Sequence, residues 1–476
     1  MKISKNNLNY HFGIIILVIF FFLNITSILG GFVTVYESAF INLLLLLVWG
    51  LVIYARTNFI LDPRNLVAVG AIFYLGLGPL SERLFIDYFS DEVFRLAVLC
   101  ACLGSCGLVL SSILWRPVNH RCQVANNDIK PNRELIKYIA IVLVLAGYFF
   151  MVINYNRVGG LLTAISISRI ERMALLSEER FNLPFIYFFI TGFSLYVYNL
   201  IIISDIKKII YQKKTEILIL VVLFLPVLLF WLLEGERSNI IKILLPAIAM
   251  FLYKYSHRIS IKGALVVIAL FLAFSFIGNV RASVSYSVLT QSIEPIKEQM
   301  KGVSLGWFIP REFAANFLSI TATVGIHNEK RFGMTYINSL IGWLPRSIYP
   351  GKKPLSLSHE LGDVLSASLD RERRLGIGYS PVSEAYLNFG ISGPLIVLFV
   401  FGVVSNLYSK LILLNRHIIK LFYFISLPLL IIYYRASVSS IISYLAYTTM
   451  ILIGCSLMYI SMKSLRLVII NNKTSE

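Results

Sequence analysis

The chain has 476 residues, of which 57% are hydrophobic and only 14% are charged, and its mean hydropathy is +0.77. Soluble globular chains are roughly 45–50% apolar and about 25% charged. These figures exclude a set of water-soluble domains, a disordered chain, a coiled coil and a disulfide-rich secreted scaffold. The net charge of +18 is typical of basic cytoplasmic loops in a membrane protein, so we expect a lipid bilayer and no nucleic acid as partner.

Twelve segments are apolar enough to cross a bilayer, which requires about 20 residues of helix. The first is expected to be a retained span, because no small-x-small cleavage site follows Leu29. The sequence therefore predicts an all-α polytopic membrane protein. The predicted spans are 12–30, 38–55, 66–80, 93–115, 136–155, 184–203, 216–233, 240–255, 264–280, 393–410, 421–434 and 441–461.

The distribution of basic residues predicts the orientation of these spans. With the N-terminus inside, the inner loops and tails carry 21 Lys and Arg, whereas the short outer loops carry seven. This bias follows the positive-inside rule. We therefore expect both termini to be cytoplasmic.

One connection is much longer than the others. Residues 281–392 form an outer segment between nine spans in 1–280 and three spans plus a tail in 393–476. Within it, 303–325 and 332–345 are apolar, but charges in the first would cost roughly 2.5–3.5 kcal/mol each at the bilayer centre. We expect interfacial or re-entrant helices that form a cap over a membrane cavity.

Cysteines give no sign of a cofactor. Cys100, Cys102 and Cys106 have a spacing that resembles a metal site, but they lie in an apolar span without a His or carboxylate beside them. Packing by small residues is the expected role. No metal site is predicted.

The outer basic residues are mostly arginine, with 14 Arg to five Lys. A guanidinium binds carboxylate or phosphate with two parallel hydrogen bonds. Ion pairs with neighbouring glutamates and a lipid-linked phosphate are both consistent with this excess. Arg237 lies in a short turn between two apolar spans, at the membrane surface. Arg281, at the end of the ninth span, could bind phosphate or anchor the helix at the interface.

Two stretches of the large segment are unusual. The run PRSIYPGKKP at 345–354 has three prolines, which fix φ and predict a rigid loop holding Arg346, Lys352 and Lys353. The run GIGYSPVSEAYLNFGISGP at 376–394 begins with glycines and continues as a predicted helix that carries Glu384. The alternative for both stretches is a plain loop with a helix cap.

The predicted spans, the long outer segment, the Arg-containing turn and these two stretches together resemble the bacterial O-antigen polymerases, the Wzy family. More distantly they are similar to the O-antigen ligases, which share a GT-C-like membrane architecture. The resemblance implies an enzyme of the bacterial inner membrane. It implies that a growing glycan on undecaprenyl pyrophosphate is moved en bloc onto a newly flipped, lipid-linked repeat unit. A chain-length regulator and a flippase are the expected protein partners.

The implied reaction assigns roles to residues. The departing pyrophosphate needs fixed cations, and the attacking hydroxyl needs a proton acceptor, for which Glu384 and His359 are the candidates. Tyrosines could stack on sugar rings. The candidate cations are Arg237, Arg281, Arg311 and Arg346, with Lys352 and Lys353 secondary, and the candidate sugar contacts are Tyr349, Tyr379, Tyr386 and Asn388.

Missing motifs are consistent with this interpretation. The sequence has no Asp-x-Asp clamp for a nucleotide sugar and no G-x4-GK[ST] loop for ATP, so no cofactor is predicted. Two other functions stay open at this point. One is a ligase that moves glycan to another lipid acceptor, and the other is a flippase for the same lipid-linked sugar.

Overall fold

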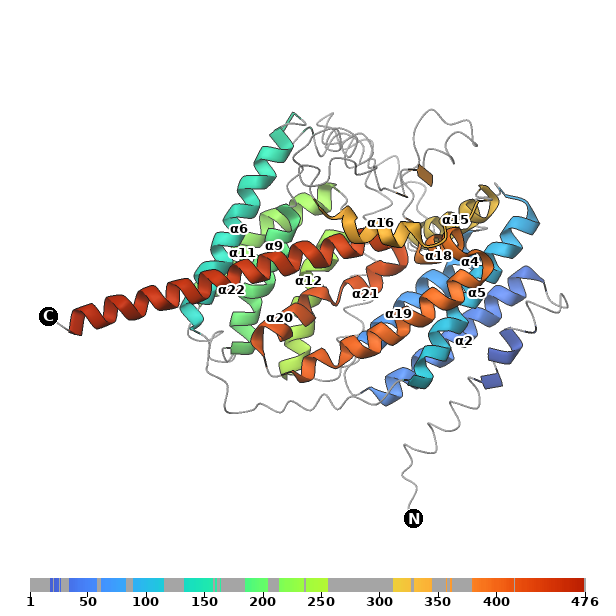
Figure 1. Ribbon diagram of the computed structural model, residues 1–476, viewed down its shortest axis with the longest axis horizontal. Coiled ribbons are helices and arrows are strands. Elements are labelled where there is room, and N and C mark those ends of the chain that lie inside the picture. The colour runs from blue at the N-terminus through green and yellow to red at the C-terminus, as the bar shows by residue number, and fades with distance from the viewer. Residues whose placement is uncertain are drawn as a thin grey trace, which may run out of the picture. The chain divides into compact units, whose positions relative to one another are not determined.

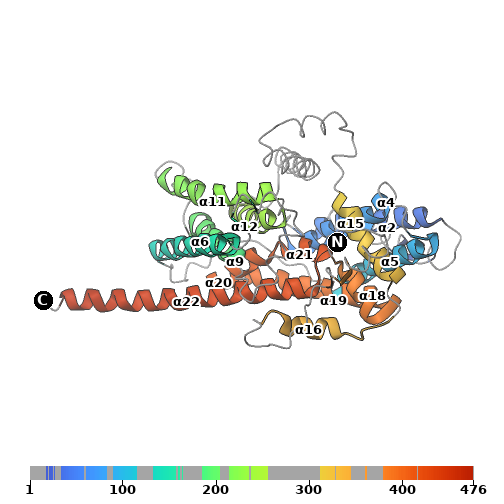
Figure 2. The same ribbon diagram turned by 90° about the horizontal axis from the view of Figure 1, so that it is seen from above.

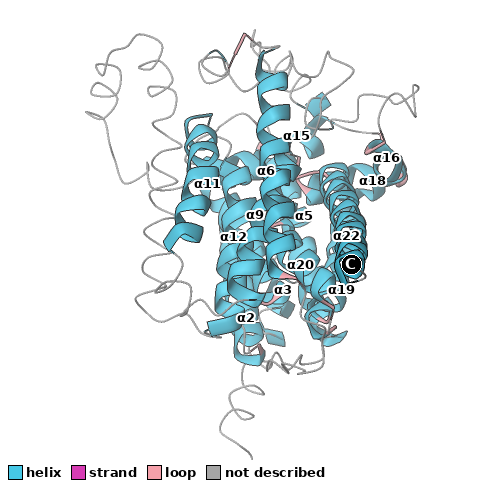
Figure 3. Cartoon of the chain, turned by 90° about the vertical axis from the view of Figure 1, so that its left-hand side faces the viewer, coloured by secondary structure: helices cyan, strands magenta, loops and turns pink. Residues whose placement is uncertain are grey.

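The computed structural model is all-helical over the residues it describes (Figure 1). No strand occurs in those residues, as the colouring of Figure 3 makes plain. The all-α prediction is therefore confirmed. The described residues are 18–19, 21–24, 26, 34–57, 61–82, 89–114, 132–156, 159–160, 163, 185–203, 214–234, 237–255, 311–326, 329–344, 357, 360–361, 379–414 and 416–474.

Eight helical stretches are long and apolar enough to cross a membrane, and each coincides with a predicted span. The chain is thus a multi-pass membrane protein. The eight are Val35–Ala55, Asp91–Ser111, Arg133–Asn156, Phe185–Ile203, Thr215–Leu232, Pro381–Leu413, His417–Arg435 and Val438–Ser464.

The other four predicted spans have different outcomes. Span 66–80 lies in a helical run over 63–82, and span 240–255 lies in α12 (Arg237–Tyr255), but neither is among the eight. Few residues of 12–30 are described, and 264–280 lies outside the described residues. The number twelve therefore stays a prediction.

The chain divides into two compact units. Unit 1 comprises Met1–Arg121, Pro310–Leu413 and Leu429–Ser443, and unit 2 comprises Cys122–Ile309, Leu414–Pro428 and Tyr444–Glu476. The described part of the long predicted outer segment, from Arg311 onward, lies in unit 1. Whether the chain also divides functionally at 280 and 392, as the sequence predicts, stays open to test.

Unit 1 is built on a close pair of helices, α5 (Asp91–Ser111) and α19 (Gly393–Ser409), which lie side by side in Figures 1 and 2. A Cβ atom added to Gly107 would lie 2.3 Å from the carbonyl oxygen of Leu395, so only glycine allows the backbones to approach this closely. Small residues at such crossings are the usual way to pack helices in membranes.

A π-helical turn, η1 (Ile72–Leu77), connects α3 (Pro63–Ala71) to α4 (Gly78–Glu82). Its backbone carbonyl at Leu75 accepts a hydrogen bond from Nδ2 of Asn42 at 3.0 Å, and Oδ1 of Asn42 accepts one from Asn24 at 3.2 Å. A wide turn leaves carbonyls without their α-helical donors. Here a side-chain amide of the preceding span, α2 (Val35–Arg56), supplies one.

Unit 2 contains α6 (Arg133–Asn156), α9 (Phe185–Tyr198), η3 (Asn199–Ile203), α11 (Lys214–Glu234), α12 and α20 (His417–Ser426). Its core is aromatic. The ring of Phe189 meets Tyr148 edge-on at 4.9 Å and Trp231 at 5.8 Å, between ring centroids. These contacts join α6, α9 and α11.

Within each unit, hydrogen bonds join helix ends that the sequence assigns to the same membrane face. In unit 1, Nδ2 of Asn406 donates to the carbonyl of Leu114 at 3.3 Å. In unit 2, the hydroxyl of Tyr198 lies 2.8 Å from Nδ1 of His417. All four residues lie at predicted inner ends. These contacts are consistent with the predicted alternation of spans. That the inner face is the cytoplasmic one stays a prediction from the distribution of charge.

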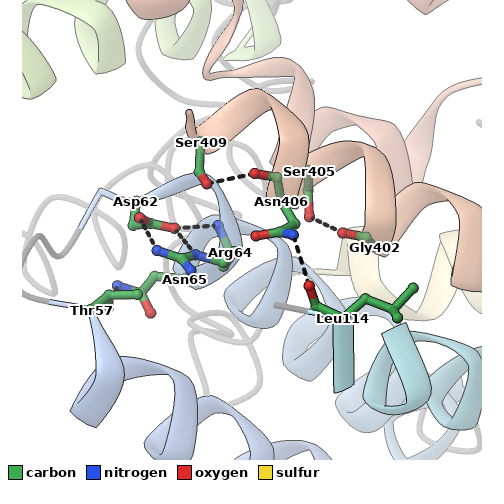
Figure 4. A network of polar contacts seen from close by, with 9 residues as sticks. All are labelled: Thr57, Asp62, Arg64, Asn65, Leu114, Gly402, Ser405, Asn406 and Ser409. Carbon is green, nitrogen blue, oxygen red and sulfur yellow. Dashed lines mark hydrogen bonds and ion pairs between the residues drawn. The ribbon is translucent and has the colours of Figure 1, made fainter. Parts of the chain in front are cut away.

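A buried ion pair lies at this end of unit 1 (Figure 4). Nε and Nη2 of Arg64 donate to the two carboxylate oxygens of Asp62 at 2.7 and 2.8 Å, and the two side chains are 2% and 0% exposed. Asn65 donates to the Thr57 hydroxyl at 2.7 Å. Asp62 also accepts from the backbone N–H of Arg64, which caps α3. Arg64, one of the inner basic residues of the sequence, is thus neutralised inside the protein.

Asp62→Asn is expected to destabilise the protein by about 3–5 kcal/mol, because it leaves a buried guanidinium without its counter-ion. Asparagine keeps the helix cap. The measurement is thermal or denaturant unfolding of the protein in lipid nanodiscs. The matched control is Asp62→Asn combined with Arg64→Met, which removes both charges and should recover most of the loss. Equal losses in the two variants would contradict this interpretation.

Candidate active site

Glu384 lies in the first turn of α18 (Pro381–Phe389), and the local sequence explains why the helix begins there. The side chain of Ser380 accepts hydrogen bonds from the backbone N–H groups of Val382 and Ser383, at 3.1 and 3.3 Å. Pro381 follows at the first helical position, where its missing donor costs nothing. The predicted helix in 376–394 is confirmed, and α18 continues through η5 (Gly390–Ser392) into α19.

The Glu384 carboxylate is completely buried and both of its oxygens accept hydrogen bonds. Oε1 accepts from the hydroxyl of Thr335 at 2.9 Å, and Oε2 accepts from the backbone N–H of Val438 at 2.9 Å. Val438 is the first residue of α22 (Val438–Thr474), where a helix N-terminus favours a negative charge. The carboxylate therefore joins three segments that are far apart in sequence.

Asn388 extends this network. Its Nδ2 donates to the Thr335 hydroxyl at 2.6 Å and to the carbonyl of Glu384 at 2.7 Å. The backbone is tied as well, since the N–H groups of Arg331 and Phe332 donate to the carbonyls of Leu387 and Asn388 at 2.9 and 3.1 Å. The chain entering α16 (Met334–Gly342) is thus fixed to α18.

Helix α16 has an unusual distribution of side chains. Its buried residues include Thr335 and Ser339, whereas Met334, Ile337 and Leu340 are 50%, 53% and 64% exposed. The helix therefore directs polar groups into the protein and apolar groups outward. An apolar outer face is typical of a helix that lies at a membrane surface.

Tyr379 precedes α18 and is almost fully buried. Burial raises the pKa of its phenol well above the usual value, and the negative charge of Glu384 adds to this rise. The phenol therefore stays protonated at physiological pH and can donate a hydrogen bond. The positive charge of Arg331 lowers the pKa of this phenol, but less than burial raises it. Arg331 also forms an ion pair with Glu360.

Helix α15 (Arg311–Ile326) packs against α4, α5 and α18. Sequence reasoning expected 303–325 to be interfacial or re-entrant, and burial within unit 1 fits the re-entrant alternative. Asn316, Ser319 and Thr323, at spacings of three and four, are all buried. The hydroxyls of Ser319 and Ser383 lie 3.1 Å apart, so this polar face of α15 meets α18 beside Glu384.

Sequence reasoning missed Thr335, Ser319 and the N–H of Val438 as members of the cluster. For Ser319 a signal was present, because polar residues recur at helical spacing in an otherwise apolar segment. Thr335 carried no such signal. The contact with Val438 depends on folding that brings residues 54 positions apart together.

Of the predicted site residues, the structure brings together Glu384, Asn388 and Tyr379. Tyr386 is separated from them. It lies two positions after Glu384, which places it on nearly the opposite side of α18, close to the thiol of Cys100. Arg237 and Arg311 are the first residues of α12 and α15, and their side chains are outside the description. Six others lie outside the described residues, namely Arg281, Arg346, Tyr349, Lys352, Lys353 and His359.

The chain was compared with known proteins. The family described as "O-antigen polysaccharide polymerase Wzy" matches residues 13–465, nearly the whole chain. No curated protein and no solved structure gives a significant match. The match covers both compact units and every described residue of the buried cluster. The chain therefore belongs to the Wzy family of O-antigen polysaccharide polymerases, multi-pass membrane enzymes of the glycosyltransferase type that join O-antigen repeat units.

Proposed function

We propose that this enzyme transfers a growing glycan en bloc from undecaprenyl pyrophosphate to a sugar hydroxyl of a second lipid-linked repeat unit, on the outer face of the bacterial inner membrane. The observation that carries the proposal is the buried polar cluster around Glu384. It lies at the end of the Pro381–Leu413 span that is opposite to Asn406 and the Asp62–Arg64 pair. Charge assigns the latter end to the cytoplasm.

The donor is already activated by its lipid, so the protein must chiefly stabilise charge on the departing pyrophosphate. Arginine suits this task, because it binds phosphate oxygens in pairs and remains charged when partly buried. Arg237 and Arg311 begin helices α12 and α15, whose N-terminal dipoles also favour an anion. Arg281, Arg346, Lys352 and Lys353 are further candidate cations, each proposed on its own, the last three from the proline-rich run at 345–354.

Glu384 is proposed to position the site, and His359 to accept the proton of the attacking hydroxyl. Both oxygens of the Glu384 carboxylate are already hydrogen-bonded, and its side chain has no exposed area. It is therefore better placed to hold α16 and the start of α22 than to receive a proton. Imidazole is a common general base near neutral pH, so His359 is the remaining candidate for this role.

The apolar outer face of α16 is proposed to rest in the outer leaflet. Met334, Ile337 and Leu340 would enter the acyl region by about 5–10 Å, as in other interfacial helices. This placement would hold Thr335, on the opposite side of α16, at the depth where a lipid-linked diphosphate meets its sugar.

Glu384→Gln is expected to slow chain extension by about tenfold or more. The substitution keeps the shape of the side chain but replaces one acceptor oxygen with an NH2 group, so a charge-assisted hydrogen bond worth roughly 1.5–3 kcal/mol is lost. The measurement is the rate of polymer formation by purified enzyme in nanodiscs, as a function of pH.

The pH profile separates the two proposed roles. Glu384→Gln should lower the rate by a similar factor at every pH, whereas His359→Gln should abolish the increase in rate with pH that a general base produces. The matched control is Glu37→Gln, since Glu37 also accepts two hydrogen bonds in a first helical turn, from Thr34, but lies outside the cluster. A normal rate in Glu384→Gln would refute the positioning role.

Arg237→Ala and Arg346→Ala are each expected to leave single repeat units in place of a polymer ladder, because the leaving pyrophosphate loses a fixed cation. The measurement is the glycan pattern in a cell that lacks its own polymerase. Lysine at the same positions should restore part of the ladder, since it keeps the charge but not the paired hydrogen bonds. Disappearance of translocated repeat units would instead indicate a flippase.

Cysteine labelling is expected to place the Glu384 cluster outside the cytoplasm. Glu329 and Lys410 are both exposed and lie in unit 1, near opposite ends of the α18–α19 run. In a background without native cysteines, Glu329→Cys should react with an impermeant maleimide in spheroplasts. Lys410→Cys should react only after the membrane is opened. The reverse pattern would refute the proposed orientation.

A further inference from the structure

Asn316 differs from the other buried polar residues of α15. Ser319 and Thr323 donate to carbonyls of their own helix, at 2.7 Å each. Asn316 is 2% exposed, yet neither its Oδ1 nor its Nδ2 has a hydrogen-bond partner among the residues that the structure describes. A buried amide without hydrogen bonds lowers the stability of the fold, and an apolar side chain of the same shape would not. The amide is therefore expected to serve a ligand rather than the folded chain itself.

Two further polar groups near Glu384 are also buried without a regular hydrogen bond to the described residues. The hydroxyls of Tyr336, on α16, and Tyr379, before α18, are buried without a hydrogen bond of normal geometry, although Asn388 and Thr323 lie close to them. Both phenols feel the charge of Glu384, and Ser319 links α15 to Ser383 beside that carboxylate. The three side chains come from α15, from α16 and from the segment just before α18.

The chemistry of these groups indicates what they could bind. An amide offers one donor group and one acceptor, and each phenol offers a hydroxyl. None of the three is charged at neutral pH, since burial raises the pKa of both phenols. A phosphate would be matched by cations. The groups suit a neutral ligand that both donates and accepts, such as a sugar.

We propose that Asn316 is a specificity-determining residue that hydrogen-bonds a hydroxyl or acetamido group of the repeat-unit sugar, from the polar face of α15 that meets α18 through Ser319 and Ser383. This inference rests on the proposed polymerase function and deepens it. The cationic residues contact the diphosphate, and Asn316 contacts the glycan. The sugar thereby supplies the partners that the buried amide lacks.

The test compares Asn316→Leu with Thr321→Val. Thr321 is a matched control, because it is also buried on α15 but already donates to the carbonyl of Phe317. The probes are the free repeat-unit oligosaccharide, released from its lipid by mild acid, and inorganic pyrophosphate. The readouts are the melting temperature in nanodiscs, with and without each probe, and the glycan ladder in cells.

Asn316→Leu is expected to melt at or above the wild-type temperature without probe. It should bind the oligosaccharide about tenfold more weakly or worse, respond normally to pyrophosphate, and form a shortened ladder. Thr321→Val should match the wild type in melting temperature, in the response to each probe and in ladder length.

A de-N-acetylated oligosaccharide shows which group of the sugar contacts Asn316. If it binds the wild type as weakly as the intact sugar binds Asn316→Leu, the contact is to the acetamido group; if its binding is unchanged, the contact is to a hydroxyl.

The outcomes separate this inference from the function on which it rests. A normal ladder and normal oligosaccharide binding in Asn316→Leu would overturn the inference and leave the polymerase intact. A lower melting temperature with weaker binding of both probes would also overturn it, by showing a structural role. If the wild type itself forms no ladder in the complemented cells, the proposed function fails.

Discussion

The Glu384 carboxylate is held by a hydroxyl from α16 and a backbone N–H from the start of α22. A charge without water must find all of its partners inside the protein, or it costs several kcal/mol. These partners exist only when α16, α18 and α22 are all in place. Asn388 then binds Thr335, and the backbone of Arg331 and Phe332 pairs with α18. The local arrangement of the cluster therefore follows from the hydrogen bonds that the buried Glu384 carboxylate requires.

The two polar clusters of unit 1 illustrate a general property of membrane helices. Along Pro381–Leu413, polar groups gather near Glu384 at one end and near Asn406 at the other, and the residues between them are mostly apolar. The Asp62–Arg64 pair is held by two side-chain hydrogen bonds and a helix cap, while Oδ1 of Asn406 in the same network is buried without a hydrogen-bond partner among the described residues. Within the described part of the chain, the polar side chains near Glu384 include the Asn316 amide and two phenol hydroxyls that have no hydrogen-bond partner. Polar side chains of both clusters therefore lie near the ends of this span, away from its apolar middle.

Much of the fold was predictable, because a membrane span consists of about 20 consecutive apolar residues. It can therefore be identified from the local sequence, without knowing which helices it packs against. The helix carrying Glu384 was also predictable from the local sequence around Ser380 and Pro381. The partners of Glu384 were not. The hydroxyl of Thr335 and the N–H of Val438 belong to residues 49 and 54 positions away in the sequence. Contacts between residues so far apart produce no local pattern that a single sequence could show. The polar face of α15 was visible as polar residues at helical spacing, but the sequence left an interfacial and a re-entrant placement both open.

The π-helical turn at Ile72–Leu77 has a consequence for how related chains can vary. Such a turn holds one residue more than an α-helical turn that covers the same rise. Loss of one residue between 72 and 77 would therefore convert it to ordinary α-helix while α3 and α4 kept their alignment. The amide of Asn42 would then lose its acceptor at Leu75. Homologues should tolerate a single-residue deletion inside this hydrophobic helix, provided that position 42 changes with it.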